Sequence, residues 1–304
     1  MSTEIKNVMI VGGTGNLGPY LVRSLLKASF TVSVLSRSSA RNANLLGATI
    51  VKSDYTYGSL VDVFTGQDAV VSALSTADVA EQKTIVDAVA AAKVKRFFPS
   101  EYGIDTSVEG LEDSAAFLKG KQDVMDHVKS KEVEGLSWTA IFVGSFIDWM
   151  LVEGQGLLCL DVRAMTGELV DSGNPKFTTT TTSQVGEAVA AALVHSDKTK
   201  NQYVYVSSFN TTQNEVIEAV ERISGRNFTL DKVGGKALYD RGTKHVEEGQ
   251  WVKGYYELAS AVTYNDAPMT YFPEKAAHWM QELGLVQEET FDEVISRVLK
   301  TVQT

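Results

Sequence analysis

A short glycine-rich loop near the start of the chain limits the folds that it can adopt. Residues 7–11 (NVMIV) form an apolar, β-rich segment, and Gly12, Gly15 and Gly18 follow it at intervals of three before a helical pattern over residues 15–28. In a strand–turn–helix unit the first glycine makes the tight turn, the second lets a pyrophosphate approach the backbone, and the third lets helix and strand pack closely. A plain glycine turn is the alternative, but this context favours a dinucleotide-binding loop.

The start of the following helix is expected to hold the phosphates. Its first backbone N–H groups have no partner within the helix, and the positive end of the helix dipole lies there. The residues predicted to contact the cofactor in this loop are Gly12, Thr14, Gly15, Asn16, Leu17 and Gly18. Ser75, just after the fourth apolar segment, is predicted to join them.

The end of the second apolar segment indicates which dinucleotide the loop prefers. NAD-binding proteins place Asp or Glu there for the ribose 2′-hydroxyl, whereas this chain has Ser36, Arg37 and Ser38, with Arg41 close behind. A guanidinium can bind a 2′-phosphate with two hydrogen bonds, and a carboxylate would repel it. We therefore expect NADP(H), bound by Arg37 and Ser38; a solvated loop charge is the competing interpretation of Arg37. Asp54, after the third segment, either meets the adenine edge or is an exposed turn residue.

Short β-rich segments and helical patterns alternate through the first half of the chain. This order predicts an α/β fold with a Rossmann-type, doubly wound parallel sheet that helices cover on both faces. The predicted strands are residues 7–11, 31–35, 48–51, 69–74, 94–98 and 138–143, and the predicted helices are residues 15–28, 78–92 and 114–130.

Beyond about residue 150 the pattern is less regular and predicts a smaller C-terminal substrate-binding subdomain. Five consecutive threonines at 178–182 favour an extended strand, because β-branched side chains are stiff; a low-complexity linker is the competing interpretation. Further expected elements are helices over residues 184–194 and 213–223, a strand over 203–206 and a mixed, aromatic-rich lid over 231–270. We divide the chain into an NADP-binding domain, residues 1–150, and a substrate-binding part, residues 151–304, that interlocks with it.

Composition narrows the classes of partner. The formal net charge is −10, and the densest basic group, residues 93–96, fits a helix end leading into a strand, so nucleic-acid binding is not expected. A run of about 18 apolar residues and a secretory leader are both absent, which favours a cytoplasmic protein without membrane attachment. Cys159 is the only cysteine and the four histidines show no metal spacing, so neither a disulfide framework nor a metal site is expected.

Three segments resemble the isoflavone reductase-like group of atypical short-chain dehydrogenases/reductases, which includes the NmrA-like proteins. They are the glycine loop, the Ser36-Arg37-Ser38 sequence, and residues 94–103 (VKRFFPSEYG). The resemblance covers residues 1–150 well, and residues 137–149 are similar to fungal members. It implies a Rossmann-type fold, NADPH as cofactor and hydride transfer to a small metabolite.

Reductases of this group use a lysine on the helix after the PSE-[FY]-G run, and Lys119 and Lys121 both stand there. Val124 and Val128 lie three and seven residues after Lys121, the spacing of a buried helix face, and therefore favour Lys121. The resemblance implies that Lys121 binds near the nicotinamide and acts as general acid or base. There are two alternatives to this role: Lys121 is an ordinary helix lysine, or it only holds the nicotinamide ribose.

Other candidate residues carry weaker signals. Tyr271 and Lys275 are the only match to the Tyr-x-x-x-Lys motif of common short-chain dehydrogenases, and Pro273 between them prevents the required helical pair, so we interpret the match as chance. Glu101 is expected to be structural and Tyr102 to line the pocket. Rings that suit an aromatic substrate, or equally the apolar core, are Trp149, Tyr255 and Tyr256.

We expect an NADPH-dependent reductase that transfers a hydride to a small, aromatic or conjugated metabolite. The alternatives are a non-enzymatic NADP(H)-sensing regulator of the NmrA type and an enzyme that keeps the cofactor for a redox-neutral step. A lysine at position 121 favours the enzyme, because sensor members tend to lack it. Met125 and Asp126 stand where the group usually has a pair of arginines, which leaves the substrate open. The oligomeric state is open as well.

Overall fold

Seven parallel strands form the central sheet of this protein, whose computed structural model describes residues 4–37, 47–75, 81–152, 157–265, 267 and 269–303. The spatial order is β3–β2–β1–β4–β5–β6–β11, and every neighbouring pair is parallel. The strands are β1 (Asn7–Val11), β2 (Thr31–Arg37), β3 (Thr49–Ser53), β4 (Ala69–Ser72), β5 (Arg96–Phe98), β6 (Ser137–Phe142) and β11 (Gln202–Tyr205). This order confirms the predicted Rossmann-type doubly wound sheet.

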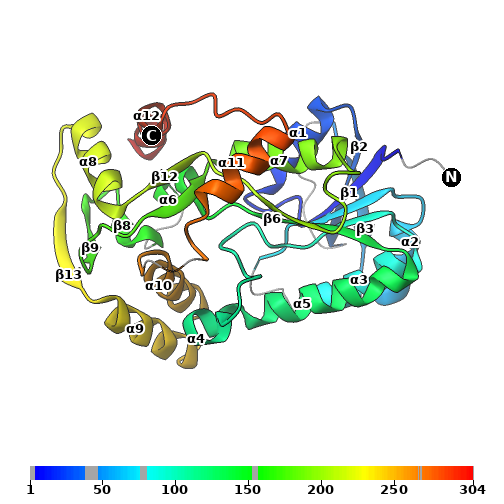
Figure 1. The fold of residues 1–304 in the computed structure, drawn as a ribbon, viewed down its shortest axis with the longest axis horizontal. Helices are drawn as coiled ribbons and strands as arrows, with labels where there is room; N and C mark the ends of the chain where they lie inside the picture. The colour runs from blue at the N-terminus through cyan, green and yellow to red at the C-terminus, as the bar shows by residue number, and fades with distance from the viewer. Residues whose placement is uncertain are drawn as a thin grey trace.

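Helices cover both faces of this sheet (Figure 1). In β1, Val8 and Ile10 join one apolar core with α1 and α7, whereas Met9 and Val11 join another core with α2, α3 and α5. The helices are α1 (Gly18–Lys27), α2 (Tyr57–Phe64), α3 (Glu81–Ala91), α5 (Lys119–Ser130) and α7 (Thr182–Val194). A strand buried on both faces needs continuous apolar sequence, which explains the NVMIV run.

The smaller part of the chain packs around a second apolar core at the other end of the molecule (Figure 1). It contains two three-stranded sheets, β12–β10–β7 and β13–β9–β8. Its strands are β7 (Ser145–Phe146), β8 (Leu160–Asp161), β9 (Thr166–Val170), β10 (Phe177–Thr180), β12 (Phe209–Thr211) and β13 (Thr229–Val233). Its helices are α6 (Ile147–Val152), α8 (Gln213–Ser224), α9 (Gly235–Glu247), α10 (Trp251–Thr263) and α12 (Phe291–Gln303). The lid predicted over residues 231–270 is therefore mostly the helix pair α9 and α10, which pack against each other.

The chain returns to the central sheet after residue 150. Helix α7 packs against α1, β11 extends the sheet beside β6, and α11 (Pro273–Glu282) lies against β11. Residues beyond 150 thus contribute a strand and two helices to the central layers, and the division into two interlocked parts at residue 150 stays a prediction. Among the described residues, no helix is both long and apolar enough to cross a membrane.

The helix predicted over residues 114–130 is interrupted. Ala115 has φ −149° and ψ 51°, so α4 (Leu111–Ala115) ends there and a 3₁₀ turn (Ala116–Leu118) leads into α5. Leu111 and Leu118 are buried against Val262 of α10. Packing on the second part of the chain therefore overrides the local helical preference.

The threonine run is an ordered strand-to-helix passage, so the linker interpretation is wrong. The hydroxyls of Thr179 and Thr180 donate to the carbonyl oxygens of Ser145 and Val143, at 2.7 and 2.6 Å. Thr181 then caps α7 by accepting a hydrogen bond from the backbone. Threonine supplies both the β-branched shape for the strand and the hydroxyls that these buried backbone groups need.

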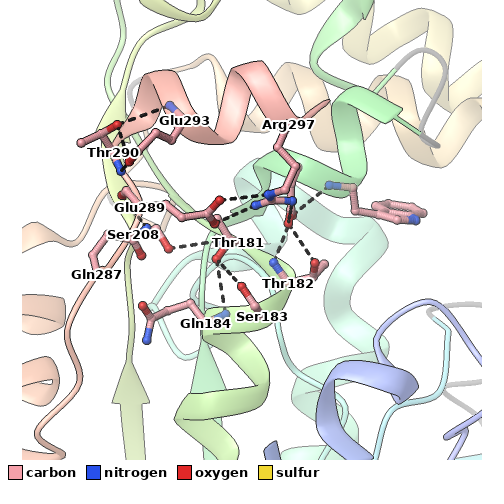
Figure 2. A network of polar contacts seen from close by, with 12 residues as sticks. Thr181, Thr182, Ser183, Gln184, Ser208, Gln287, Glu289, Thr290, Glu293 and Arg297 are labelled. Atoms are coloured by element: carbon pink, nitrogen blue, oxygen red, sulfur yellow. Dashed lines mark hydrogen bonds and ion pairs between the residues drawn. The ribbon is translucent and has the colours of Figure 1, made fainter. Parts of the chain in front are cut away.

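A polar network fixes the start of α7 to the C-terminal helix α12 (Figure 2). The buried carboxylate of Asp148 accepts hydrogen bonds from the amide and the hydroxyl of Thr182, both at 3.0 Å. Arg297 of α12 lies 3.5 Å from the same carboxylate and donates to both oxygens of Glu289 at 2.9 and 2.8 Å. Glu289 and Arg297 thereby help to fix the start of α7, the helix that packs on α1.

Candidate cofactor and active site

The glycine loop lies where the order of the strands reverses. The chain passes from β1 to β2 on one side and from β4 to β5 on the other, so the carboxyl ends of β1 and β4 border the crevice where ligands bind in such sheets. Gly12 has φ +83°, and a Cβ there would lie 2.6 Å from the carbonyl oxygen of Ala73 in the segment after β4. Only glycine fits this turn, because any side chain would collide with the neighbouring strand's backbone.

Gly15 and Gly18 have different surroundings. A Cβ on Gly18 would lie 2.0 Å from the carbonyl oxygen of Gly13, so helix α1 can start against the loop only without a side chain there. Thr14, Gly15 and Asn16 are exposed, whereas Leu17 packs partly on the core beneath. Helix α1 has no side-chain N-cap and no acidic residue in its first turn. Its N-terminus can therefore receive an anion.

Arg37 is the last residue of β2, beside Ser53 of β3. Its guanidinium carbon lies 5.7 Å from the centre of the Tyr55 ring, and its Nη2 lies 3.5 Å from Oε1 of Glu81. The structure thus brings Arg37 to the crevice edge that the sequence predicted. Ser38 and Arg41 lie outside the described residues, and Ser75 is exposed just after β4.

Asp54 is a turn residue. Its Oδ1 accepts hydrogen bonds from the amide and the hydroxyl of Thr56 at 3.0 and 2.8 Å, and these bonds hold the pKa of this carboxyl below its usual range. Thr56 in turn caps α2. The arrangement favours the turn interpretation of Asp54 over an adenine contact.

The two candidate lysines have different surroundings. Lys121 is 11% exposed, and its Nζ donates to the carbonyl oxygens of Ser100 and Glu101 at 2.9 and 2.6 Å. Lys119 is 42% exposed and forms an ion pair with Asp123 at 2.6 Å on the outside of the same helix. Only Lys121 reaches the carboxyl end of β5.

The segment after β5 is tied to its neighbours by buried hydrogen bonds. The hydroxyl of Ser100 donates to the carbonyl oxygen of Leu74 at 2.7 Å, and its amide donates to Oε1 of Gln82 at 3.0 Å. These contacts link the ends of β4 and β5 to α3 and set the carbonyl groups that face Lys121. The role of the buried Gln82 could not be predicted from the sequence, since nothing local marks a glutamine on an alanine-rich helix as a site residue.

Glu101 is a fully buried carboxyl next to Lys121. Its Oε2 accepts a hydrogen bond from the hydroxyl of Thr106 at 3.0 Å and lies 4.0 Å from Nζ of Lys121. Burial raises the pKa of Glu101, and the positive charge of Lys121 opposes this only in part.

Replacing Glu101 by glutamine should reduce the pH dependence of stability. The raised pKa means that the folded chain binds this proton more tightly than the unfolded chain. The stabilising contribution of Glu101 is therefore present below its unfolded pKa and is lost as pH rises through its folded pKa. Glutamine keeps the volume and an acceptor for Thr106. Urea unfolding at several pH values should show the variant gaining stability over the parent protein from about pH 4 upward. If the stability advantage of the variant shrank with rising pH, the raised pKa of Glu101 would be contradicted.

Tyr102 lies next in the same segment, with φ +33°. Its side chain joins the apolar core on the α1 and α7 face, and its hydroxyl has no hydrogen-bond partner in the described part of the chain. Burial raises the pKa of this phenol far above its usual range. The geometry places Tyr102 in the core rather than on an open pocket wall.

Lys275 does not pair with Tyr271 in the way that the Tyr-x-x-x-Lys motif requires. Its Nζ lies 3.1 Å from Oδ2 of Asp105 and 3.2 Å from the hydroxyl of Tyr205, which itself donates to Asp105 at 2.9 Å. Burial raises the pKa of Tyr205. This cluster fastens the segment after β5 to β11 and α11, and the chance interpretation of the motif agrees with it.

Two of the histidines contribute to helix packing. His127 of α5 contacts Asp87 of α3 at 2.8 Å, and His245 of α9 contacts Glu257 of α10. Across the described ranges, no group of three or more His, Cys, Asp or Glu residues could hold a metal ion.

Candidate aromatic side chains pack against other rings at two places. Phe117 and Tyr255 meet edge to face at 5.5 Å, and Phe146 and Trp149 at 6.4 Å between ring centres. The indole nitrogen of Trp149 is buried without a partner among the described residues.

The sheet order and the glycine loop define a Rossmann-type α/β protein with a dinucleotide-binding crevice. The chain belongs to the NmrA-like family, whose sequence model matches residues 4–261. This confirms the family that the sequence resemblance indicated.

Similar proteins extend over almost the whole chain. Oxidoreductase aprR of Aspergillus flavus is 30% identical over 301 residues, which cover 96% of this chain and 98% of that protein. Oxidoreductase poxI of Penicillium oxalicum is 29% identical over 293 residues, covering 94% and 92%. The isoflavone reductase homolog IRL of Zea mays is 28% identical over 254 residues, covering 78% and 81%.

Solved structures confirm the fold. AtPrR2 with NADP⁺ and (+)-pinoresinol is 22% identical, has a TM-score of 0.75, and is matched over 97% of this chain and 99% of that chain. The leucoanthocyanidin reductase of Vitis vinifera with NADPH is 19% identical, has a TM-score of 0.75, and is matched over 97% and 99%. These relatives support the predicted oxidoreductase class and the predicted NADP(H) cofactor.

Proposed function

We propose that this chain is an NADPH-dependent reductase of small aromatic or conjugated metabolites. The observation that carries the proposal is the position of Lys121, a nearly buried cation at the carboxyl end of β5, beside the crevice that the glycine loop opens. Similar proteins that are named oxidoreductases, and solved relatives with bound NADP⁺ or NADPH, support the cofactor and the reaction class. The relative bound to (+)-pinoresinol supports an aromatic substrate.

The residues present fit a dinucleotide phosphate. Gly12 and Gly18 keep the loop close to β4 and α1, and the exposed backbone at Thr14, Gly15 and Asn16 can approach a pyrophosphate. Arg37, at the end of β2, can bind a 2′-phosphate, and Ser75 follows β4. Ser38, which lies outside the described residues, is proposed to contact the same phosphate. When bound, the cofactor supplies the hydride.

Lys121 is proposed to supply the proton that balances the hydride. Its Nζ donates to two carbonyl oxygens at 2.9 and 2.6 Å and lies 4.0 Å from the Glu101 carboxyl. An ammonium group in this place can donate a proton to substrate or hold the nicotinamide ribose through its remaining N–H. Residues 151–304 are proposed to supply most of the substrate contacts. The buried thiol of Cys159 needs no oxidising compartment, so we propose a cytoplasmic location.

Titration with NADPH and NADH tests the cofactor assignment. In the parent protein NADPH should bind more tightly than NADH. Arg37→Ala should weaken NADPH binding by about 10- to 100-fold, because charge-assisted hydrogen bonds to the 2′-phosphate are lost, and should leave NADH binding nearly unchanged. Nicotinamide fluorescence reports both affinities. Equal affinity of the parent protein for the two nucleotides would overturn the NADPH assignment.

A further inference from the structure

The fold brings a carboxylate to the end of β2, where the local sequence has none. Glu81 is the first residue of α3 and stands far along the chain from Arg37. Its Oε1 nevertheless lies 3.5 Å from Nη2 of Arg37. The sequence argument for NADP(H) depended on a missing carboxylate at this point, so the contact bears directly on cofactor choice.

The ion pair crosses the crevice. Arg37 ends β2 on one side of β1, and Glu81 follows β4 on the other side. Both side chains remain accessible, with exposed fractions of 59% for Arg37 and 47% for Glu81. The Tyr55 ring lies 5.7 Å from the guanidinium carbon, and Lys52 Nζ donates to the carbonyl oxygen of Arg37 at 3.4 Å. The guanidinium thus has an aromatic ring and a carboxylate as neighbours.

We propose that Glu81 competes with the cofactor's 2′-phosphate for Arg37 and so limits how strongly the chain prefers NADPH over NADH. The inference rests on the proposed cofactor site. A phosphate that hydrogen-bonds to Arg37 lies within a few ångströms of the Glu81 carboxylate, unless that side chain turns away. Either the two anions repel each other or the Arg37–Glu81 pair must break, and both reduce the affinity for NADPH. NADH has no 2′-phosphate, so neither effect lowers its affinity.

The test compares Glu81→Gln with the parent protein for NADPH and NADH binding. Glutamine keeps the length of the side chain and removes the charge. NADPH should bind about 5- to 10-fold more tightly to the variant, the size of one carboxylate–phosphate repulsion at an accessible site. NADH affinity should stay within about 2-fold, and the gain for NADPH should shrink at high salt.

Glu247→Gln is the matched control. Glu247 is exposed on α9, at the opposite end of the molecule from β2 (Figure 1), and its replacement changes the net charge equally. The control should bind both nucleotides as the parent protein does. An unchanged or weaker NADPH affinity in Glu81→Gln, or an equal gain in the control, would overturn the role of Glu81. Failure of the parent protein to bind NADPH would instead overturn the proposed function.

Discussion

Lys121→Ala should lower the turnover number by about 10²- to 10⁴-fold, the usual contribution of a positioned general acid. The reason is that the ammonium group held by Ser100 and Glu101 is the proposed proton donor at the carboxyl end of β5. The affinity for NADPH should fall far less, since Arg37 and the glycine loop are proposed to hold the opposite half of the cofactor. NADPH oxidation with a panel of conjugated aromatic substrates, beside a fluorescence titration, separates the two effects.

Lys119→Ala provides the control for this experiment. Lys119 stands on the same helix, two residues earlier, and its ammonium pairs with Asp123 away from β5. Its loss should leave both turnover and NADPH affinity close to those of the parent protein. A similar loss of turnover in both variants, or none in Lys121→Ala, would exclude Lys121 as the proton donor.

Arg96→Ala should destabilise the chain by about 3 to 4 kcal/mol, the second large effect that we expect. Arg96 is 4% exposed, and its guanidinium donates to the hydroxyls of Ser137, Thr139 and Thr199 at 2.9, 2.8 and 3.1 Å. Its Nη2 also donates to the carbonyl oxygen of Ser196 at 2.7 Å. Burial lowers the pKa of Arg96 to about 10. Alanine would remove all four hydrogen bonds and leave a cavity between β5, β6 and the end of α7.

Urea denaturation measures this loss, and Arg222→Ala gives the comparison. Arg222 forms two hydrogen bonds of 2.7 Å with Asp292, but its side chain is 59% exposed. Its replacement should leave the denaturation midpoint close to the parent value, because water solvates both partners. A midpoint for Arg96→Ala that equals that of Arg222→Ala would show that the buried network contributes little.

The family-specific run VKRFFPSEYG has largely structural roles in this fold. Lys95 forms an ion pair with Asp68 at 2.7 Å and Arg96 links three elements, both at the amino end of β5. At the other end, Ser100 and Glu101 present backbone carbonyls to Lys121. The run therefore joins neighbouring elements at its amino end, and at its carboxyl end its carbonyl oxygens hold Lys121, the proposed catalytic residue.

The sequence by itself determined the central architecture. The apolar run NVMIV, the spacing of Gly12, Gly15 and Gly18, and the alternation of strands and helices predicted the doubly wound parallel sheet and its loop. The place of β11 beside β6 came only from the structure. These features are local, because periodicity and turn geometry act over a few residues. The ordered threonine run also followed from local preference, although its hydroxyls find their partners only in other strands.

Only the tertiary structure decided which side chains meet. Helix spacing favoured Lys121 over Lys119, but only the fold shows that Lys121 contacts the carbonyl oxygens after β5 while Lys119 pairs with Asp123. The contact of Glu81 with Arg37, and that of Lys275 with Tyr205, join segments that lie far apart in the chain. No local pattern encodes such contacts, because they depend on how parallel strands bring their carboxyl ends to one edge of the sheet.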